Sequence, residues 1–317
     1  MPVSGTNTFS QTRNQLINRA GSILGVKTRG RNLTAEETNE ISDILNMMVK
    51  NWKAKGQYLW KTAEATLFLV PGQVVYKLDG TTANATETFS QTTTTADASS
   101  GASSIDVSSI DGFAVGYNIG IAQDNNTIHW TTISSIAFPT VNLDDVLPED
   151  SASGSKVYVY QTKITRPERV NSCRLRYDDD ITDVLMAQIS RDTYFGYSNK
   201  FSQGKPNSYF YDKQLTFGDI YIYPAPDNAT DTIKFTFEKQ FFDFTQAIDD
   251  PDFPPEWLLP IATNLAYWAH YDFGVSRDKA ERIKRDAEQL LADSEGYDRE
   301  ATSIYFQPST IVIGEND

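Results

Sequence analysis

Apolar residues recur at helical spacing in two segments near the N-terminus. The first segment, residues 8–24, places its apolar side chains on one face and is followed by Gly25, which is typical of a helix end. The second segment begins at Thr34, which has the spacing of a capping box with Glu37, and it ends at Gly56. The pattern therefore predicts a pair of amphipathic helices.

The helical period returns after Pro254-Pro255. Proline is well tolerated in the first turn of a helix, because the N–H that it lacks has no partner there. The segment from Trp257 to Trp268 has a wide apolar face, and Ser276 is placed to cap a more charged helix that follows. These closing helices and the N-terminal pair predict a helical bundle.

Between the helical regions, apolar and polar residues alternate in short runs bounded by turn residues. Five such runs in 103–160 predict a small barrel or sandwich. Residues 80–100 are mostly Thr, Ala, Ser and Asn, a composition that favours a mobile linker or a weakly ordered loop. Further strands are expected in 215–223 and 232–237, and a short helix in 183–194.

We therefore expect an α+β fold with an α-helical bundle core, made of the N-terminal helix pair and the C-terminal helices, together with β-strands and an inserted small all-β barrel or sandwich domain. Four segments are predicted: the helix pair and a β-hairpin in 1–80, the inserted domain in 81–163, the rest of the core in 164–297, and an extended C-terminal arm in 298–317.

The composition describes an acidic chain with enough apolar residues to fold. Hydrophobic residues make up 39% of the 317 residues, and 42 acidic against 28 basic side chains give a net charge of −14. Tight DNA binding neutralises phosphates with Lys and Arg, so this charge disfavours it but allows DNA to pass by. No apolar run approaches the roughly 18 residues of a membrane span, and no secretory signal is evident, so we expect synthesis in the cytoplasm and no membrane contact.

Residues with catalytic or metal-binding chemistry are few. Cys173 is the single cysteine, so we expect it to be a small buried apolar residue. His129 and His270 are the only histidines, which excludes the common His-rich zinc sites and makes a His-containing triad improbable. No P-loop, dinucleotide fingerprint or His-Glu-x-x-His motif is present. Three acidic clusters lack the alternating spacing of a calcium loop: Asp144-Asp145, Asp178-Asp179-Asp180 and Asp249-Asp250. We expect no cofactor, no metal and no enzymatic activity.

Two groups of residues are candidates for partner contacts. A basic loop carries Lys27, Arg29 and Arg31, which either contact DNA or an acidic partner or form an ordinary exposed loop. The C-terminal segment carries two apolar patches, Ile304-Tyr305-Phe306 and Ile311-Val312-Ile313. Because disordered tails are normally polar, these patches indicate an arm that makes strand or groove contacts with a neighbouring chain.

Three motifs together resemble a known family. Trp52, Gly56, Leu59 and Trp60 form a Trp-x-x-x-Gly-x-x-Leu-Trp pattern, and a Gly-Gln-x-x-Tyr turn follows at residues 72–76. The third motif runs from Pro254-Pro255-Glu256-Trp257 through residues 271–275 into a charged helix. In order and spacing these motifs resemble the head-to-tail adaptors of short-tailed phages, also called packaged-DNA-stabilisation or tail accessory proteins. The resemblance covers roughly 1–80 and 164–300, and 81–163 is an insertion relative to the shortest members.

The resemblance implies a structural virion protein of the phage neck or tail, made in the host cytoplasm. Such a protein forms a ring of about twelve copies under the portal, with identical subunits packed head to tail. The ring extends the DNA channel, helps to retain packaged DNA without sequence-specific binding, and docks nozzle or tail-fibre proteins. The arm with its patches at 304–306 and 311–313 is expected to contact the portal or a neighbouring copy.

Two other functions stay open at the level of sequence. One is a virion-associated cell-wall hydrolase, which requires two carboxylates across a cleft. The other is a host-glycan-binding tail module, in which the inserted β domain uses Trp130 and Tyr117. A peptidoglycan turbidity assay distinguishes the first alternative from an adaptor, and an adsorption assay distinguishes the second.

Overall fold

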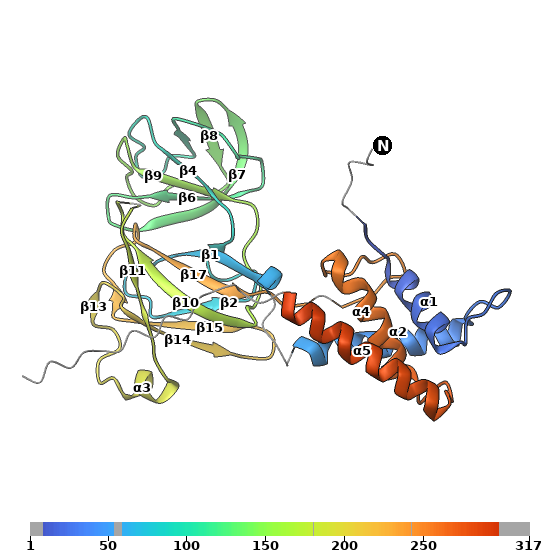
Figure 1. The fold of residues 1–317 in the computed structure, drawn as a ribbon. Helices are drawn as coiled ribbons and strands as arrows, with labels where there is room; N and C mark the ends of the chain where they lie inside the picture. Colours follow the sequence, from blue (N-terminus) through green and yellow to red (C-terminus); the bar gives the residue numbers. More distant parts are fainter. Residues whose placement is uncertain (1–8, 54–58, 180, 242, 298–317) are drawn as a thin grey trace, which may run out of the picture. The chain divides into compact units, whose positions relative to one another are not determined.

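The computed structural model describes residues 9–53, 59–179, 181–241 and 243–297 (Figure 1). The chain forms two compact units. The smaller unit combines Met1–Trp60 with Phe241–Asp317, and the larger unit is Lys61–Gln240. The smaller unit is therefore assembled from two stretches of sequence that are separated by the whole of the larger one.

Helices make up the described part of the smaller unit. They are α1 (Arg13–Leu24), α2 (Ala35–Lys53), the 3-10 turn η2 (Pro255–Trp257), α4 (Leu258–Ala269) and α5 (Arg277–Tyr297), and a second 3-10 turn, η1 (Leu59–Lys61), leads into the larger unit. Their apolar faces share one core, which includes Leu16, Ile17, Ile41, Leu45, Met48, Ile261, Leu265 and Ile283. The predicted helical stripes at both ends of the chain are confirmed.

Local signals begin both N-terminal helices and end the first. The stop at Gly25 and the capping box at Thr34 are confirmed, and the predicted end of α2 at Gly56 lies outside the described residues. The Gln15 N–H donates to Thr12 Oγ1 while the Gln15 side chain accepts from the Thr12 N–H, which forms a capping box at α1. Gly25 ends α1 in the left-handed conformation, with φ of 79°. Thr34 and Glu37 exchange the same pair of bonds before α2. These contacts satisfy backbone groups that a helix end otherwise leaves unpaired.

Two sheets of the larger unit enclose a common apolar core. The five-stranded sheet has the order β11-β10-β17-β1-β3, with β1 (Thr62–Phe68), β3 (Ala85–Thr86), β10 (Arg169–Arg176), β11 (Asp183–Leu185) and β17 (Thr232–Glu238). The four-stranded sheet has the order β12-β14-β15-β2, with β2 (Val75–Leu78), β12 (Ala187–Gln188), β14 (Ser208–Lys213) and β15 (Gly218–Tyr223). Side chains from both sheets meet, among them Leu67, Tyr76, Cys173, Tyr209, Ile220 and Phe235.

A six-stranded sheet, in the order β4-β9-β6-β7-β8-β5, forms the second part of the larger unit (Figure 1). Its strands are β4 (Ser90–Thr93), β5 (Ser104–Asp106), β6 (Asn118–Ala122), β7 (Ile128–Ala137), β8 (Thr140–Leu143) and β9 (Lys156–Tyr160). The sheet curves until its two edges meet at a bridge between Thr94 and Val107. It encloses its own core, with Ile119, Ile121, Ile133, Val141 and Val157.

The remaining elements of the larger unit are short. Strands β13 (Gln203–Gly204) and β16 (Ala225–Pro226) pair in parallel, and α3 (Arg191–Gly196) begins at Ser190, whose side chain accepts from the Thr193 N–H. The segment expected to be a helix from residue 183 instead forms β11 and β12 before α3 starts. The apolar residues that suggested a helix in this segment therefore belong to the edges of two sheets.

The prediction of an α-helical bundle core is wrong. In the part of the chain that the structure describes, four sheets dominate the fold, and four of the five α-helices belong to the smaller unit. Strand β17 pairs along its whole length with β1, from Thr62–Glu238 to Phe68–Thr232. Segments on either side of the insertion therefore form backbone hydrogen bonds with each other in one sheet. The alternation of apolar and polar residues within each strand did not identify this pairing.

The expectation of a mobile linker at 80–100 is also wrong. This segment contains β3 and β4, which pair with β1 and β9 respectively. The Asp79 carboxylate accepts bonds from the N–H groups of Thr81 and Thr82, which shapes the turn before β3. Threonine-rich composition is compatible with strands because β-branched side chains fit a pleated surface.

Candidate functional site

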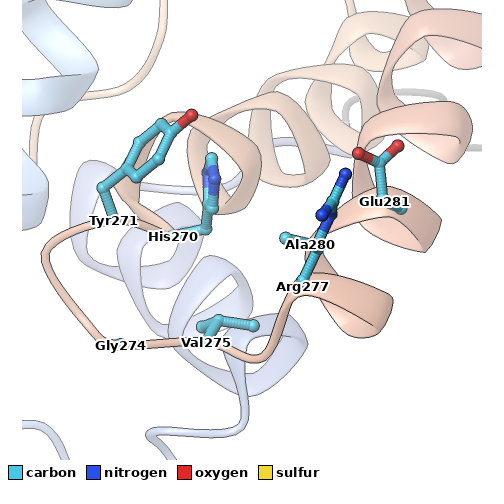
Figure 2. Close-up of a pocket in the computed structure, with 7 residues that line it drawn as sticks. All are labelled: His270, Tyr271, Gly274, Val275, Arg277, Ala280 and Glu281. Atoms are coloured by element: carbon cyan, nitrogen blue, oxygen red, sulfur yellow. The ribbon is translucent and has the colours of Figure 1, made fainter.

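One hollow of the smaller unit lies where the chain turns from α4 to α5 (Figure 2). It has a volume of about 450 Å³ and is lined by His270, Tyr271, Gly274, Val275, Arg277, Ala280 and Glu281. Gly274 adopts a positive φ of 59°, which a residue with a side chain adopts only rarely. The hollow is thus a product of the tight turn between the two helices.

His270 is the residue of this hollow whose side chain could act as an acid, a base or a metal ligand, but its contacts give it a structural role. The side chain is 91% buried, with 9% exposed, and its Nδ1 contacts the Tyr267 carbonyl oxygen. The imidazole stacks on the Tyr267 ring at a centroid distance of 5.2 Å and contacts Tyr271 at 3.9 Å. Tyr271 itself is 82% exposed. The residues that line the hollow therefore give it an aromatic and polar surface. Among these lining residues, no nucleophile is paired with a general base.

The segments that carry the family resemblance meet in an aromatic cluster of the smaller unit. Trp257 lies next to Trp52 at the end of α2, with ring centroids 6.1 Å apart, and next to Trp60 at 5.0 Å. Phe253 contacts Trp60 at 5.8 Å. The aromatic side chains of the first and third motifs thus pack against each other, although about 200 residues separate the motifs.

The Gly-Gln-x-x-Tyr motif also has a structural role. Gly72 takes a positive φ of 76° in the turn before β2. The buried Tyr76 hydroxyl accepts from the Val70 N–H at 2.9 Å and donates to the Val70 carbonyl at 3.2 Å, so the ring closes the turn. Burial raises the pKa of Tyr76 above its usual value, which keeps the hydroxyl protonated as a donor.

The basic loop uses two of its three cations for its own structure. Lys27 Nζ donates to Asn18 Oδ1 at 2.8 Å. Arg31 donates to the Val26 carbonyl at 3.0 Å and forms an ion pair with Glu37. Arg29 is exposed. Contact of this loop with DNA or a partner stays a prediction, and Arg29 is the side chain best placed for it.

The acidic clusters make local structural contacts. Asp144 and Asp145 accept from the hydroxyls of Thr132 and Thr131, and the other two clusters each contain a carboxylate that binds nearby backbone. Asp179 accepts from the N–H groups of Ile181 and Thr182, and the Thr182 hydroxyl lowers the pKa of Asp179 to about 2. Asp249 accepts from the Gln246 N–H, a bond that lowers the pKa of its carboxyl group. Asp180 lies outside the described residues. No group of three His, Cys, Asp or Glu side chains in the described ranges is placed to hold a metal ion.

A second hollow of the smaller unit, of about 290 Å³, bears on the hydrolase alternative. It is lined by Asp243, Phe244, Thr245, Asp249, Asp250, Asp252 and Phe253. Asp243 pairs with Lys50 at 2.6 Å, and Asp249 holds the surrounding loop through Thr245 and Gln246. Two of these carboxylates are thus engaged in structural contacts.

The larger unit has a shallow groove of about 230 Å³ beside the six-stranded sheet. Its lining includes Thr88, Phe89, Ser90, Gly112, Tyr117, Val159, Tyr160 and Gln161. Of the two aromatic residues expected to bind a glycan, Tyr117 lines this groove. Trp130 does not, because it packs against Phe68 at 4.9 Å and Tyr160 at 5.4 Å. The sequence alone could not separate the two roles, since both residues follow the strand pattern.

The arm residues Ile304, Tyr305, Phe306, Ile311, Val312 and Ile313 lie outside the described residues. Cys173 is fully buried, and this burial raises the pKa of its thiol. It therefore acts as a small apolar residue of the core, as expected. No helix in the described ranges is long and apolar enough to span a membrane.

Comparison with known proteins gives limited information. No protein-family model matches the chain, and no curated protein matches it. Among solved structures, part of the chain is similar to the Gp54 tailspike of Acinetobacter baumannii bacteriophage AP22, in complex with A. baumannii capsular saccharide. The two share 17% identity over 23% of this chain and 15% of the tailspike chain, with a TM-score of 0.20. Part of the chain thus has a phage tail protein as a structural neighbour, and a likeness this small supports no functional conclusion.

Proposed function

We propose that this protein is a non-enzymatic structural component of a phage virion, a head-to-tail adaptor that forms a ring under the portal. The observation that carries the proposal is the packing of Trp52, Trp60 and Trp257. The first and third motifs that resemble the adaptor family are distant in sequence but belong to one cluster, so their joint occurrence has a common structural cause. Two unrelated short matches would have no reason to converge in this way, and the Gly-Gln-x-x-Tyr motif, which lies in the larger unit, is not part of this cluster.

The proposed role uses a hollow of the smaller unit and the negative charge of the whole chain. The hollow between α4 and α5, with the exposed Tyr271 at its rim, offers the smaller unit a docking surface for a portal segment. The net charge of −14 repels phosphate, so a ring with acidic inner walls lets DNA slide without sticking. The ring extends the channel, helps to retain packaged DNA, and docks tail proteins.

Electron microscopy of the purified chain mixed with its portal tests this proposal. We expect a closed ring beneath the portal, as head-to-tail packing allows, and about twelve copies per virion by quantitative mass spectrometry, the number that the resemblance to the adaptor family implies. Tyr271→Ala is expected to weaken portal binding, while Tyr297→Ala, at a similarly exposed tyrosine of the same unit, serves as the control. One or two copies per virion, or a location away from the neck, would contradict an adaptor role.

A second candidate function is host-glycan binding by the larger unit. The groove beside Tyr117 favours it, because Ser90 and Gln161 place hydroxyl and amide groups next to an aromatic ring. Tyr117→Ala is then expected to reduce adsorption of otherwise normal particles, and Phe138→Ala, a 61% exposed residue in the same part of the chain, serves as control. Unchanged adsorption of the Tyr117→Ala particles would eliminate this candidate.

A further inference from the structure

The edge of the five-stranded sheet at β11 is exposed and apolar. All three residues of β11 are exposed, with 72% of Leu185 and 38% of Val184 accessible, and Ile181 just before the strand is 85% exposed. Natural sheets usually protect an edge with lysine, proline or a covering segment. Residues 181–185 contain neither lysine nor proline, and no other strand of the described chain pairs with the outer side of β11.

The backbone of β11 presents free hydrogen-bonding groups along this edge. The bonds from the Tyr177 N–H to Thr182 and from the Met186 N–H to Cys173 show which residues of the strand face β10. By alternation Val184 also faces β10, and the N–H and C=O groups of Asp183 and Leu185 point outward. Such a row of groups is a template for an additional strand.

The charge on this edge is already offset. The Asp183 carboxylate accepts two bonds from the Arg176 guanidinium, both at 2.8 Å. An incoming segment therefore meets a locally balanced surface with an exposed leucine, and it needs no charge of its own. The balanced charge favours an uncharged, apolar segment as the partner.

Outside the described residues, the C-terminal segment contains two uncharged apolar patches, and the second, at 309–313, has the stronger strand propensity. Residues 309–313 read Ser-Thr-Ile-Val-Ile and carry no charge. Four of the five are β-branched, the side-chain type most favoured in strands. The segment begins twelve residues after α5 ends at Tyr297, and an extended chain of that length reaches about 40 Å.

We propose that residues 309–313 add as a strand to the outer edge of β11 in a neighbouring copy of this chain. The inference rests on the proposed ring, which holds identical copies side by side. Because the net charge of −14 opposes association of the copies, their contacts must depend on apolar and backbone groups. Strand addition supplies both, through the outward groups of Asp183 and Leu185 and the exposed Leu185 side chain.

Cysteine crosslinking on portal-bound rings tests the proposal directly. The native Cys173 is fully buried, so introduced cysteines react selectively. One preparation carries Leu185→Cys and the other Val312→Cys, and the two are mixed before assembly and oxidation. We expect a disulfide-linked dimer only in the mixture. A mixture of Phe138→Cys with Val312→Cys is expected to give none, although Phe138 is also well exposed, at 61% against 72% for Leu185.

A proline variant tests the backbone contact. Leu185→Pro removes an N–H that points outward, so the pairing of β11 with β10 is retained while strand addition is blocked. With Asp183→Cys as the reporter beside it, we expect the yield of crosslink to Val312→Cys to fall about tenfold, equivalent to about 1.4 kcal/mol. The thermal unfolding midpoint should stay within the range of the unmodified chain.

The outcomes separate this inference from the adaptor proposal. Rings that form under the portal without the Leu185–Val312 crosslink overturn the strand addition and leave the adaptor role intact. A crosslink that forms within single chains carrying both cysteines, and never between copies, also overturns it. Absence of any ring overturns both proposals.

Discussion

Gly120 in β6 has a tryptophan ring where its side chain would be. Gly120 pairs with Trp130 across β6 and β7, and a Cβ atom at Gly120 would lie 2.6, 2.6 and 2.8 Å from three atoms of that ring. Ordinary contacts of a Cβ atom are longer than about 3.4 Å. Trp130 is itself held against Phe68 of β1 and Tyr160 of β9, so it joins the six-stranded sheet to the five-stranded sheet.

We predict that Gly120→Ala destabilises the protein, although Gly→Ala at an unstrained position usually stabilises by about 0.4–1 kcal/mol through the unfolded chain. Here the added methyl group must displace the indole, and overpacking of this kind costs about 1–3 kcal/mol. The net effect is therefore a loss of about 0–2.6 kcal/mol. For a domain of this size, each kcal/mol lowers the unfolding midpoint by about 2–4 °C.

Thermal and urea unfolding, followed by tryptophan fluorescence, measure this effect. Gly196→Ala is the matched control, because a Cβ at Gly196 meets no atom within 4 Å and the residue has no positive φ. Combining Gly120→Ala with Trp130→Leu should recover part of the loss, since the smaller side chain leaves room for the methyl group. If Gly120→Ala is more stable than the parent chain, or if the double variant shows no coupling, the steric argument is refuted.

Three further predictions concern buried and charged groups. Tyr76→Phe leaves the Val70 N–H without the hydroxyl partner it has now, so the free energy of unfolding should fall by about 1–3 kcal/mol in urea, and Tyr117→Phe should change it much less. Burial, together with Lys239, lowers the pKa of Lys61 from 10.5 to about 8. The free energy of unfolding should therefore rise as the pH increases from about 8 to 10.5, because the unfolded chain binds more protons in this range. Lys61→Met should flatten this rise, and an unchanged pH profile in the variant would contradict the reasoning. The Thr182 hydroxyl lowers the pKa of Asp179 to about 2, below the unfolded value of about 3.9. The contribution of the Asp179 carboxylate to stability is therefore present above about pH 4 and lost as the pH falls toward about 2. A titration of this carboxyl group by NMR with a midpoint near about 4 would refute the prediction.

Several local features could be read directly from the sequence. The capping residues Thr34 and Glu37 and the terminating Gly25 are next to the elements they control, so their effect depends only on neighbours within one helical turn. The role of Cys173 as a buried apolar residue was also predictable, because a single cysteine cannot form a disulfide within the chain or a thiolate metal site alone.

The candidate sites were harder to predict. Tyr117 and Trp130 both belong to the strand-rich insertion, yet one lines a groove and the other packs against Phe68 in a different sheet. Likewise, Lys27 binds Asn18 of α1 and Arg31 binds the Val26 carbonyl, which charge counting could not anticipate. Which side chain is free for a partner depends on contacts whose members are separated in sequence or set by loop geometry.

The sequence by itself determined the helical segments at the two ends, the stop of α1 at Gly25 and the capping box before α2, because these follow from residue type and short spacing. Only the tertiary structure decided that sheets dominate the fold and that Thr62–Phe68 pairs with Thr232–Glu238. A strand shows which of its faces is apolar, but its hydrogen bonds go to a partner that sequence periodicity does not identify. The long-range pairing of β1 with β17 therefore became visible only in the folded chain.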